Sequence, residues 1–323
     1  MPSEPIVVLG MHRSGTSVAA GLLRELGVHL GDESDLLPPD VLDNPDGYFE
    51  HAKFVEINNA LLAAMGGSWA HPPNLTGRWE RSGAVQRLLP QAKALVATLQ
   101  KQPPWGWKDP RTCLTLPFWL RLTPNARFLW VVRHPVEVAM SMSARHEGYV
   151  TRQRAIDLWT QYNRSVFERF NPERTLVVGH ESVLADPAQA IDRMTEFFRL
   201  KPTPEARARA VHSVRGRPPK SDELLHAASS GLEMEEALEL YASLSALSPM
   251  RDPQSHAVTE QLLKDALDRI AVLEQTCDYR AQQVEALFAT PGFRPLLAVR
   301  ARLGRIKRAL LGVGTPAHRS ERA

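Results

Sequence analysis

Short apolar runs alternate with amphipathic segments over the first 220 residues of the chain. Three runs are short, apolar and mostly rich in β-branched residues, as buried strands are: 6–9, 127–132 and 175–178. A helical pattern follows each run, starting near residue 15 and covering 135–143 and 187–200. Strands that alternate with helices predict an α/β fold, with a parallel sheet between two layers of helices.

The pattern changes after Gly216-Arg-Pro-Pro219. From residue 263 to 287, apolar positions recur in steps of three and four with one violation at Arg280, which predicts a coiled coil. Residues 296–311 alternate aliphatic and basic side chains, as amphipathic helices do. We expect four parts: a domain over 1–220, a helical extension and linker over 221–252, a coiled coil over 253–290 and a basic amphipathic tail over 291–323.

Composition and charge exclude several classes of protein. The chain has 323 residues, of which 43% are hydrophobic and 23% charged, an ordinary globular composition. Two cysteines, Cys113 and Cys277, are too few for a disulfide framework or a cysteine zinc site. The net charge of +3 conceals a tail of +7 over 294–323 and a body of −4. The domain itself is therefore not expected to bind nucleic acid.

The sequence also predicts location and assembly. The run at 6–9 is too short for a signal peptide, and no apolar stretch has the ~20 residues that span a bilayer. We expect a cytoplasmic protein whose basic tail makes peripheral contact with a membrane surface. The alternative is that the tail is a frayed, solvated terminus. The heptad region 263–287 predicts a homodimer, with a helix packed on the domain as the alternative.

The loop between the first strand and the first helix has the composition of a phosphate-binding loop. Residues 10–17 read Gly-Met-His-Arg-Ser-Gly-Thr-Ser, so backbone N–H groups and a helix N-terminus meet at one point. The loop nearly matches G-x-x-x-x-G-K-[ST], but Thr16 stands where the lysine belongs, and Arg13 supplies a cation instead. An ordinary strand-to-helix turn is the alternative interpretation.

Two further groups of polar residues belong with this loop. Arg133 ends the second strand and Ser141 follows it by eight residues. Because ligands bind at the carboxyl ends of the strands in such sheets, Arg133 is expected beside the 10–17 loop, where its fork suits a second phosphate. In Trp105-Gly-Trp-Lys-Asp-Pro-Arg-Thr112, Lys108 and Arg111 flank a turn that presents two cations. Solvated surface side chains are the alternative for each.

These motifs resemble the sulfotransferases that use 3′-phosphoadenosine 5′-phosphosulfate, especially the Golgi and tyrosylprotein types and their bacterial relatives. Residues 13–17 resemble the family's 5′-phosphosulfate loop, and Arg133 with Ser141 resembles its 3′-phosphate site. Residues 181–187 and 197–200 resemble its E-x-L, D-P and F-x-x-L stretch, and residues 43–50, Asp-Asn-Pro-Asp-Gly-Tyr-Phe-Glu, resemble a motif of the bacterial relatives. The resemblance covers about residues 5–215.

The resemblance implies a three-layer, P-loop-like domain and sulfonate transfer from this donor to a hydroxyl of a saccharide, lipid or peptide, without a metal. It implies that the 5′ group of the donor is held by Arg13, Ser14, Gly15, Thr16 and Ser17, and the 3′-phosphate by Arg133 and Ser141. Lys108 and Arg13 would stabilise charge on the transferring and leaving oxygens. A late basic segment that includes Arg217 would close over the bisphosphate.

A general base must also take the acceptor's proton. Counting without gaps from Arg13 to the tyrosylprotein pattern places the base at Glu33. Glu50 or His51, at the end of the Gly-Tyr-Phe motif, is the alternative, and one sequence leaves the choice open.

Two other functions are compatible with parts of the pattern. A P-loop kinase with a degenerate loop would bind Mg²⁺ and ATP, but Thr16 and Arg133 replace the residues that such an enzyme needs. A non-catalytic scaffold would use the C-terminal helices to dock on a membrane or an assembly.

Overall fold

Four parallel strands form the central sheet. The computed structural model describes residues 4–39, 47–74, 77, 79–145, 150–216, 233–250, 257–262, 264, 265 and 268. Within these residues the strand order is β2 (Gly106–Lys108), β1 (Ile6–Leu9), β3 (Arg127–Val132) and β4 (Thr175–Gly179). All three pairings are parallel, so the carboxyl ends of the strands share one edge. The predicted α/β class is confirmed.

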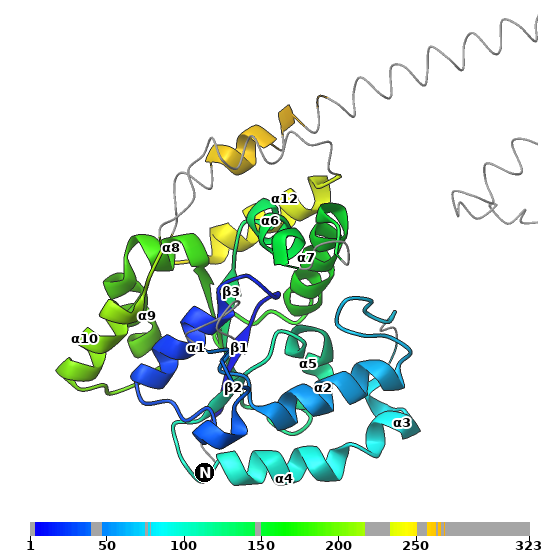
Figure 1. The fold of residues 1–323 in the computed structure, drawn as a ribbon, viewed down its shortest axis with the longest axis vertical. Coiled ribbons are helices and arrows are strands. Elements are labelled where there is room, and N and C mark those ends of the chain that lie inside the picture. The colour runs from blue at the N-terminus through cyan, green and yellow to red at the C-terminus, as the bar shows by residue number, and fades with distance from the viewer. Residues whose placement is uncertain are drawn as a thin grey trace, which may run out of the picture. The chain divides into compact units, whose positions relative to one another are not determined.

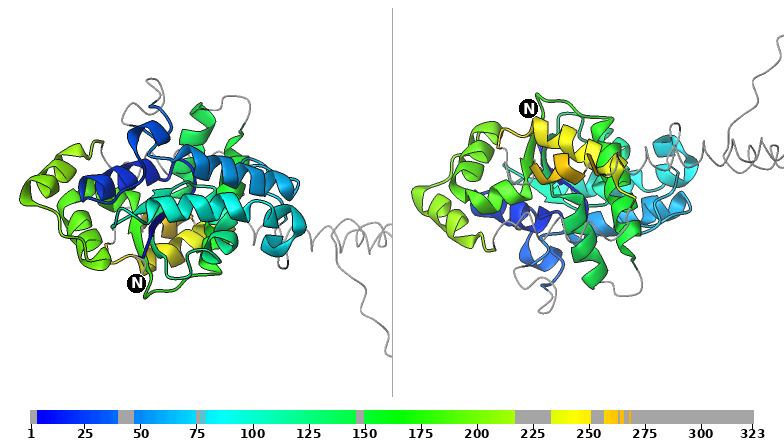
Figure 2. Two further views of the ribbon diagram at one scale, coloured as in Figure 1. Left: turned by 90° about the horizontal axis from the view of Figure 1, so that it is seen from below. Right: turned by 90° about the horizontal axis from the view of Figure 1, so that it is seen from above.

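Helices cover both faces of this sheet, as Figures 1 and 2 show. One face carries α1 (Thr16–Glu25), α9 (Pro187–Phe198) and α10 (Pro204–Ser213). The other carries α2 (Ala52–Ala64), α4 (Leu89–Leu99), α5 (Thr112–Leu120), α6 (Pro135–Arg145) and α7 (Arg152–Phe167). Short helical turns connect these elements: η1 (Glu33–Asp35), η2 (Trp79–Arg81), α3 (Gly83–Gln86) and α8 (His180–Ala185).

The alternation of side chains along each strand creates two separate cores. Val7 and Leu9 of β1 pack with α2, α4, α5 and α7, whereas Ile6 and Val8 pack with α1 and α9. All four side chains are buried, which explains why β1 is an unbroken apolar run rather than an alternating one. The three predicted layers are present.

Strand β2 was not predicted from the sequence, because Gly106-Trp-Lys108 contains no apolar run of strand length. Its pairing depends on close backbone approach to β1. A Cβ atom at Gly106 would lie 1.8 Å from the carbonyl oxygen of Ile6, so only glycine fits there. The strand delivers Lys108 to the carboxyl edge of the sheet.

Helix α12 (Glu235–Leu247), within the predicted extension, shares the core of the sheet domain. Its Tyr241 ring packs on His134 and Trp159, with ring centroids 4.9 and 6.2 Å apart. The chain divides into two compact units, 1–264 and 265–323. The second unit holds the predicted basic tail and most of the predicted coiled coil, which lie outside the described residues apart from positions 265 and 268.

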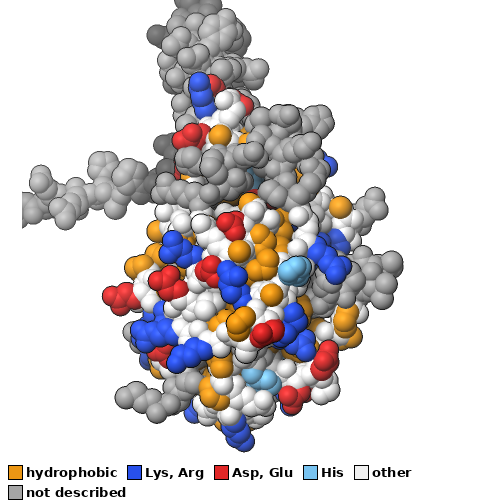
Figure 3. Space-filling view, turned by 90° about the vertical axis from the view of Figure 1, so that its left-hand side faces the viewer, with side chains coloured by type: hydrophobic (Ala, Val, Ile, Leu, Met, Phe, Trp, Pro, Cys, Tyr) orange, Lys and Arg blue, Asp and Glu red, His pale blue; other side chains and the backbone are white. Residues whose placement is uncertain are grey.

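The surface over α8, α9 and α10 mixes charges of both signs (Figure 3). The ion pairs Arg207–Asp192 and Arg209–Glu25, at 2.8 and 3.0 Å, belong to these helices and α1. Positive and negative side chains therefore lie beside one another on this face. Among the described helices, none combines the length and the apolar character needed to cross a bilayer.

Candidate active site

A cavity of about 440 Å³ opens at the carboxyl edge of the sheet. The 10–17 loop after β1, Lys108 at the end of β2 and Arg133 after β3 all contribute to its wall. Its remaining lining comes from Val18, Leu37, Tyr48, Glu50, Trp69, Pro110, Arg111, Met142, Arg145 and His180. The 10–17 loop and Arg133, which were expected to lie together because both follow strands of one parallel sheet, thus line the same cavity.

The backbone of the 10–17 loop is shaped by glycines and by one left-handed arginine. Gly10, Arg13 and Gly15 have φ angles of 145°, 68° and 86°. A Cβ atom at Gly15 would lie 2.1 Å from Nδ1 of His180, and one at Gly10 would lie 2.5 Å from the carbonyl oxygen of Val131. These positions accept only glycine, and they bring the backbone close to the cavity.

The N-terminus of α1 is left without a capping side chain in the described part of the chain. Gly15 is the N-cap, no side chain caps the helix, and its first turn contains no acidic residue. Thr16 and Ser17 open the helix and line the cavity together with Arg13. Backbone N–H groups, two hydroxyls and one guanidinium therefore converge where an anion can bind.

Ser14, predicted to bind the 5′ group, is not among the described lining residues of the cavity. It is fully buried, and its Oγ has no hydrogen-bond partner in the described part of the chain. Its backbone N–H donates to the carbonyl of Met11 at 3.1 Å, which closes the turn. Ser14 therefore stabilises the turn of the loop from its buried side.

The two predicted anion-binding groups are joined by hydrogen bonds. Arg13 Nε donates to Ser141 Oγ at 2.9 Å, and a guanidinium nitrogen of Arg133 donates to the carbonyl oxygen of Arg13 at 3.0 Å. Arg133 also forms a two-pronged pair with Glu137, with both distances 3.0 Å. Glu137 fixes the plane of the Arg133 guanidinium, a contact that the sequence reasoning missed.

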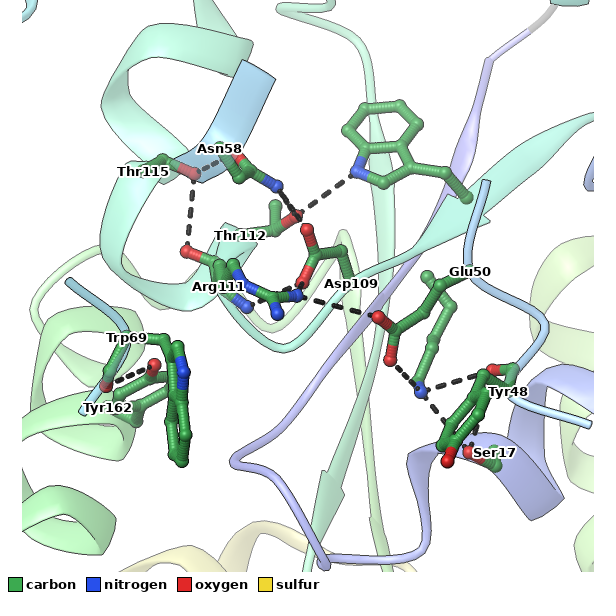
Figure 4. A network of polar contacts seen from close by, with 12 residues as sticks. Ser17, Tyr48, Glu50, Asn58, Trp69, Asp109, Arg111, Thr112, Thr115 and Tyr162 are labelled. Carbon is green, nitrogen blue, oxygen red and sulfur yellow. Dashed lines mark hydrogen bonds and ion pairs between the residues drawn. The ribbon is translucent and has the colours of Figure 1, made fainter. Parts of the chain in front are cut away.

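Lys108 and Glu50 form a buried ion pair in the wall of the same cavity (Figure 4). The Lys108 Nζ–Glu50 Oε1 distance is 2.7 Å, and the two side chains are 3% and 8% exposed. Lys108 also donates to Ser17 Oγ at 3.2 Å and to the carbonyl of Tyr48 at 3.1 Å. Arg111 reaches the second oxygen of Glu50 at 3.4 Å. Glu50 is therefore held between two cations.

The structure separates the three candidate bases. Glu50 lines the cavity, while Glu33 and His51 are not among its described lining residues. The Glu33 side chain is 87% exposed and pairs with Arg24 at 3.3 Å. The count that favoured Glu33 assumed no gap, but the chain between α1 and Glu50 is irregular and carries Glu33 on the outward turn η1.

His51 has a structural task at the start of α2. Its Nδ1 accepts from the backbone N–H of Lys53 at 3.3 Å, which caps the helix. Burial lowers the pKa of His51, so the ring is held neutral. Arg217, the remaining predicted site residue, lies outside the described residues.

Two histidines, His12 and His180, also line the cavity. His180, at the start of α8, packs on Gly15, and burial together with the charge of Arg133 lowers its pKa to about 3. His12 packs between Trp69 and Tyr162, with ring centroids 5.0 and 5.8 Å away. The position of His180 directly after a strand was the signal that could have placed it here.

No group of three or more His, Cys, Asp or Glu side chains in the described residues is arranged to hold a metal ion.

Comparison with known proteins matches residues 5–205 to the model of the sulfotransferase family. The chain is 36% identical over 101 residues to a Caenorhabditis elegans protein named "Putative protein-tyrosine sulfotransferase", and 34% identical over 101 residues to its Caenorhabditis briggsae counterpart. Each match covers 29% of this chain, and the two cover 39% and 36% of those relatives. The chain thus spans well under half of the length of these relatives.

Solved structures similar to this chain include sulfotransferase STF9 from Mycobacterium avium, with 17% identity and a TM-score of 0.43 over 72% of this chain and 78% of the other. The sulfotransferase domain of the Synechococcus PCC 7002 olefin synthase has 19% identity and a TM-score of 0.44, over 80% and 94%. The family model covers well over half of the 323 residues, in the region that builds the cavity. This chain belongs to the sulfotransferase family.

Proposed function

We propose that this protein transfers a sulfonate group from 3′-phosphoadenosine 5′-phosphosulfate to the hydroxyl of an acceptor. The observation that carries the proposal is the joining of two anion-binding groups across one cavity, through Arg13, Ser141 and Arg133. This donor has a 5′-phosphosulfate and a separate 3′-phosphate, which matches two separate groups rather than one continuous triphosphate cradle.

The 10–17 loop would bind the 5′ end of the donor. The uncapped N-terminus of α1, the hydroxyls of Thr16 and Ser17 and the Arg13 guanidinium supply donors for its oxygens. The missing Walker lysine fits this assignment, because no β- and γ-phosphates need to be bridged. Arg133 and Ser141 would bind the 3′-phosphate.

Lys108 and Glu50 would carry the chemistry. The acceptor oxygen attacks sulfur, a new S–O bond forms, and the S–O bond to the 5′-phosphate breaks with its electron pair going to adenosine 3′,5′-bisphosphate. Glu50 takes the acceptor's proton, because it is the one acid among the described lining residues. Lys108 and Arg13 stabilise the charge on the transferring and leaving oxygens.

The test is transfer of labelled sulfonate from the donor by the purified full-length chain to saccharide, lipid and peptide acceptors. We expect product with at least one acceptor class in the presence of EDTA. Transfer of phosphate from Mg²⁺-ATP, with no sulfonate transfer, would contradict the proposal and favour a kinase. Absence of both, with no binding of the bisphosphate, would favour a scaffold.

We propose a separate role for the C-terminal region. The heptad pattern over 263–287 supports self-association, and the +7 charge of 294–323 supports contact with anionic lipid at a cytoplasmic membrane surface. Truncation after Lys264, which retains the core residues Val258 and Leu262, should give a monomer that still transfers sulfonate. Light scattering of both forms checks the assembly state, and an unchanged mass would contradict the dimer.

A further inference from the structure

A chain of buried polar contacts leads from the interior of the domain to Glu50 (Figure 4). Asn58 Nδ2 donates to Asp109 Oδ2 at 2.8 Å. The other oxygen of Asp109 accepts from the backbone N–H of Arg111 at 3.0 Å and from its guanidinium at 2.8 Å. The same guanidinium nitrogen lies 3.4 Å from Glu50 Oε2. Helix α2 and the turn between β2 and α5 thus help to fix the position of the Glu50 carboxylate.

Asn58 and Asp109, at the inner end of this series of contacts, are held by several hydrogen bonds. Asn58 and Asp109 are fully buried. The Asn58 carbonyl oxygen accepts from Thr115 Oγ1 at 2.6 Å and from the Trp119 indole at 2.8 Å, which sets the direction of its amide. Asp109 cannot turn without leaving a buried donor unpaired, and such a loss costs about 1–3 kcal/mol.

Arg111 is charged and held in its place. Burial opposes its charge, but the carboxylates of Asp109 and then Glu50 raise the pKa of Arg111 above its ordinary value. Its side chain is 13% exposed, and one nitrogen bonds both carboxylates. The planar guanidinium therefore cannot follow a ligand into the cavity without breaking its contact with Asp109.

Lys108 differs from Arg111 in this respect. Its ammonium group ends a flexible four-carbon stem and contacts Glu50, Ser17 Oγ and the Tyr48 carbonyl, all at the cavity wall. A donor sulfonate that enters beside Ser17 competes for this ammonium directly. When Lys108 turns to the sulfonate, Glu50 loses its contact of 2.7 Å, and Arg111 is the cation that remains.

We propose that Arg111, anchored by Asp109, is a positioning residue that holds Glu50 in place while Lys108 turns to the transferring sulfonate. Glu50 Oε2 stays on Arg111, so Oε1 is the oxygen that receives the acceptor's proton. Lys108 is the movable partner of Glu50 and Arg111 the fixed one. This inference rests on the proposed sulfonate transfer.

The test compares Arg111→Gln with Glu50→Gln and the double variant, in the full-length chain. We expect Arg111→Gln to lower kcat on the order of 10- to 100-fold, as misplacement of a catalytic group does. Affinity for adenosine 3′,5′-bisphosphate, measured by calorimetry, should stay within about twofold, since Arg111 does not act on the donor. In the Glu50→Gln background the same substitution should cause no further loss, because the group it positions is gone.

A second pair of variants separates positioning from folding. Whichever way its amide turns, Asp109→Asn places an NH2 donor against a donor of Asn58 or of Arg111. Adding Asn58→Asp restores a hydrogen bond between positions 58 and 109 with donor and acceptor exchanged. We expect Asp109→Asn to lose activity and the double exchange to recover at least part of it, with thermal midpoints measured for both. Arg121→Gln is the matched control, since Arg121 is exposed, bonds the Glu80 carbonyl and is not among the described lining residues of the cavity.

The failures of the two proposals are distinguishable. If the unsubstituted chain neither binds the bisphosphate nor transfers sulfonate, the proposed function is wrong and the inference with it. If the unsubstituted chain is active but Arg111→Gln matches it in kcat, Arg111 does not position Glu50. The inference is also wrong if Arg111→Gln lowers kcat by the same factor in the Glu50→Gln background as in the unsubstituted chain. A substitution that lowers only the affinity for the bisphosphate, and not kcat, would contradict it too.

Discussion

The two sides of the cavity differ in the groups that they present. The side formed by the 10–17 loop and Arg133, the phosphate side, presents two guanidinium groups, two hydroxyls and a helix N-terminus without a side-chain cap. The other, the Glu50 side, sets Lys108 and Arg111 against Glu50 and Asp109. The first side gathers hydrogen-bond donors around a helix end, and the second pairs each of its two carboxylates with a cation.

This difference assigns a different task to each side. A helix N-terminus with guanidinium and hydroxyl donors around it suits a ligand whose negative charge does not change, such as a phosphate. A neutral cluster of paired charges can lose one partner to an incoming group and leave a carboxylate ready to accept a proton. The predictions below remove one element at a time from each side, in order of decreasing effect.

Glu50→Gln should have the largest effect on turnover. Loss of a general base typically costs 10²–10⁴-fold, and we expect kcat to fall within about that range. Affinity for the bisphosphate should stay the same or rise, because removing a carboxylate leaves Lys108 and Arg111 with less compensation. Steady-state kinetics and calorimetry check both. A matching loss of bisphosphate affinity would contradict the division between the two sides.

Arg133→Ala should act on binding instead. Loss of a charged hydrogen-bonding group costs about 1.5–3 kcal/mol, so bisphosphate affinity should fall roughly 10- to 150-fold. At saturating donor, kcat should change by less than the affinity does. Arg133→Lys keeps the charge without the fork and should give an intermediate affinity. An unchanged dissociation constant for Arg133→Ala would remove Arg133 from the donor site.

Glu181→Gln should have the smallest effect, on stability alone. Burial and the neighbouring Glu137 carboxylate raise the pKa of Glu181 to about 8, from an ordinary value of 4.5. Between these values the folded state binds more protons than the unfolded chain, so the free energy of unfolding falls as pH rises and levels off above 8.

Because an amide does not ionise, Glu181→Gln should flatten that fall. Burial lowers the pKa of His134 and His180 to about 3. Their contribution to the free energy of unfolding therefore changes with pH only below about pH 6.5. Burial raises the pKa of the Cys113 thiol to about 12, so this group lowers the free energy of unfolding of both proteins as pH approaches 9. The difference between the two proteins in urea denaturation from pH 7 to 9 therefore isolates Glu181. Parallel pH profiles for the two proteins would show that Glu181 is ionised in the folded state.

The sequence was most informative where local rules decide the structure. Apart from Arg127 and Thr175 at their first positions, the strands β1, β3 and β4 carry apolar residues and one glycine, because both faces of the sheet are covered. The rule that ligands bind at the carboxyl ends of the strands then placed Arg13 and Arg133 on one edge. Strand β2 escaped notice because backbone approach at Gly106, not side-chain pattern, permits its pairing.

The base could not be chosen from the sequence for a similar reason. Glu33 and Glu50 both lie outside the long helices, so no periodicity orients their side chains. The proposal of Glu50 depends on its contact with Lys108, a residue 58 positions away that arrives on the unpredicted strand. The roles of Glu137 and Arg111 likewise depend on contacts that only the folded chain defines.

Calorimetric titration of the full-length chain with adenosine 3′,5′-bisphosphate and with adenosine 5′-monophosphate, both in EDTA, tests the central claim most directly. Two separate anion sites predict that the bisphosphate binds at least about tenfold more tightly, and that Arg133→Ala removes most of this difference. Equal affinities for the two nucleotides, or binding only of ATP with Mg²⁺, would contradict the account.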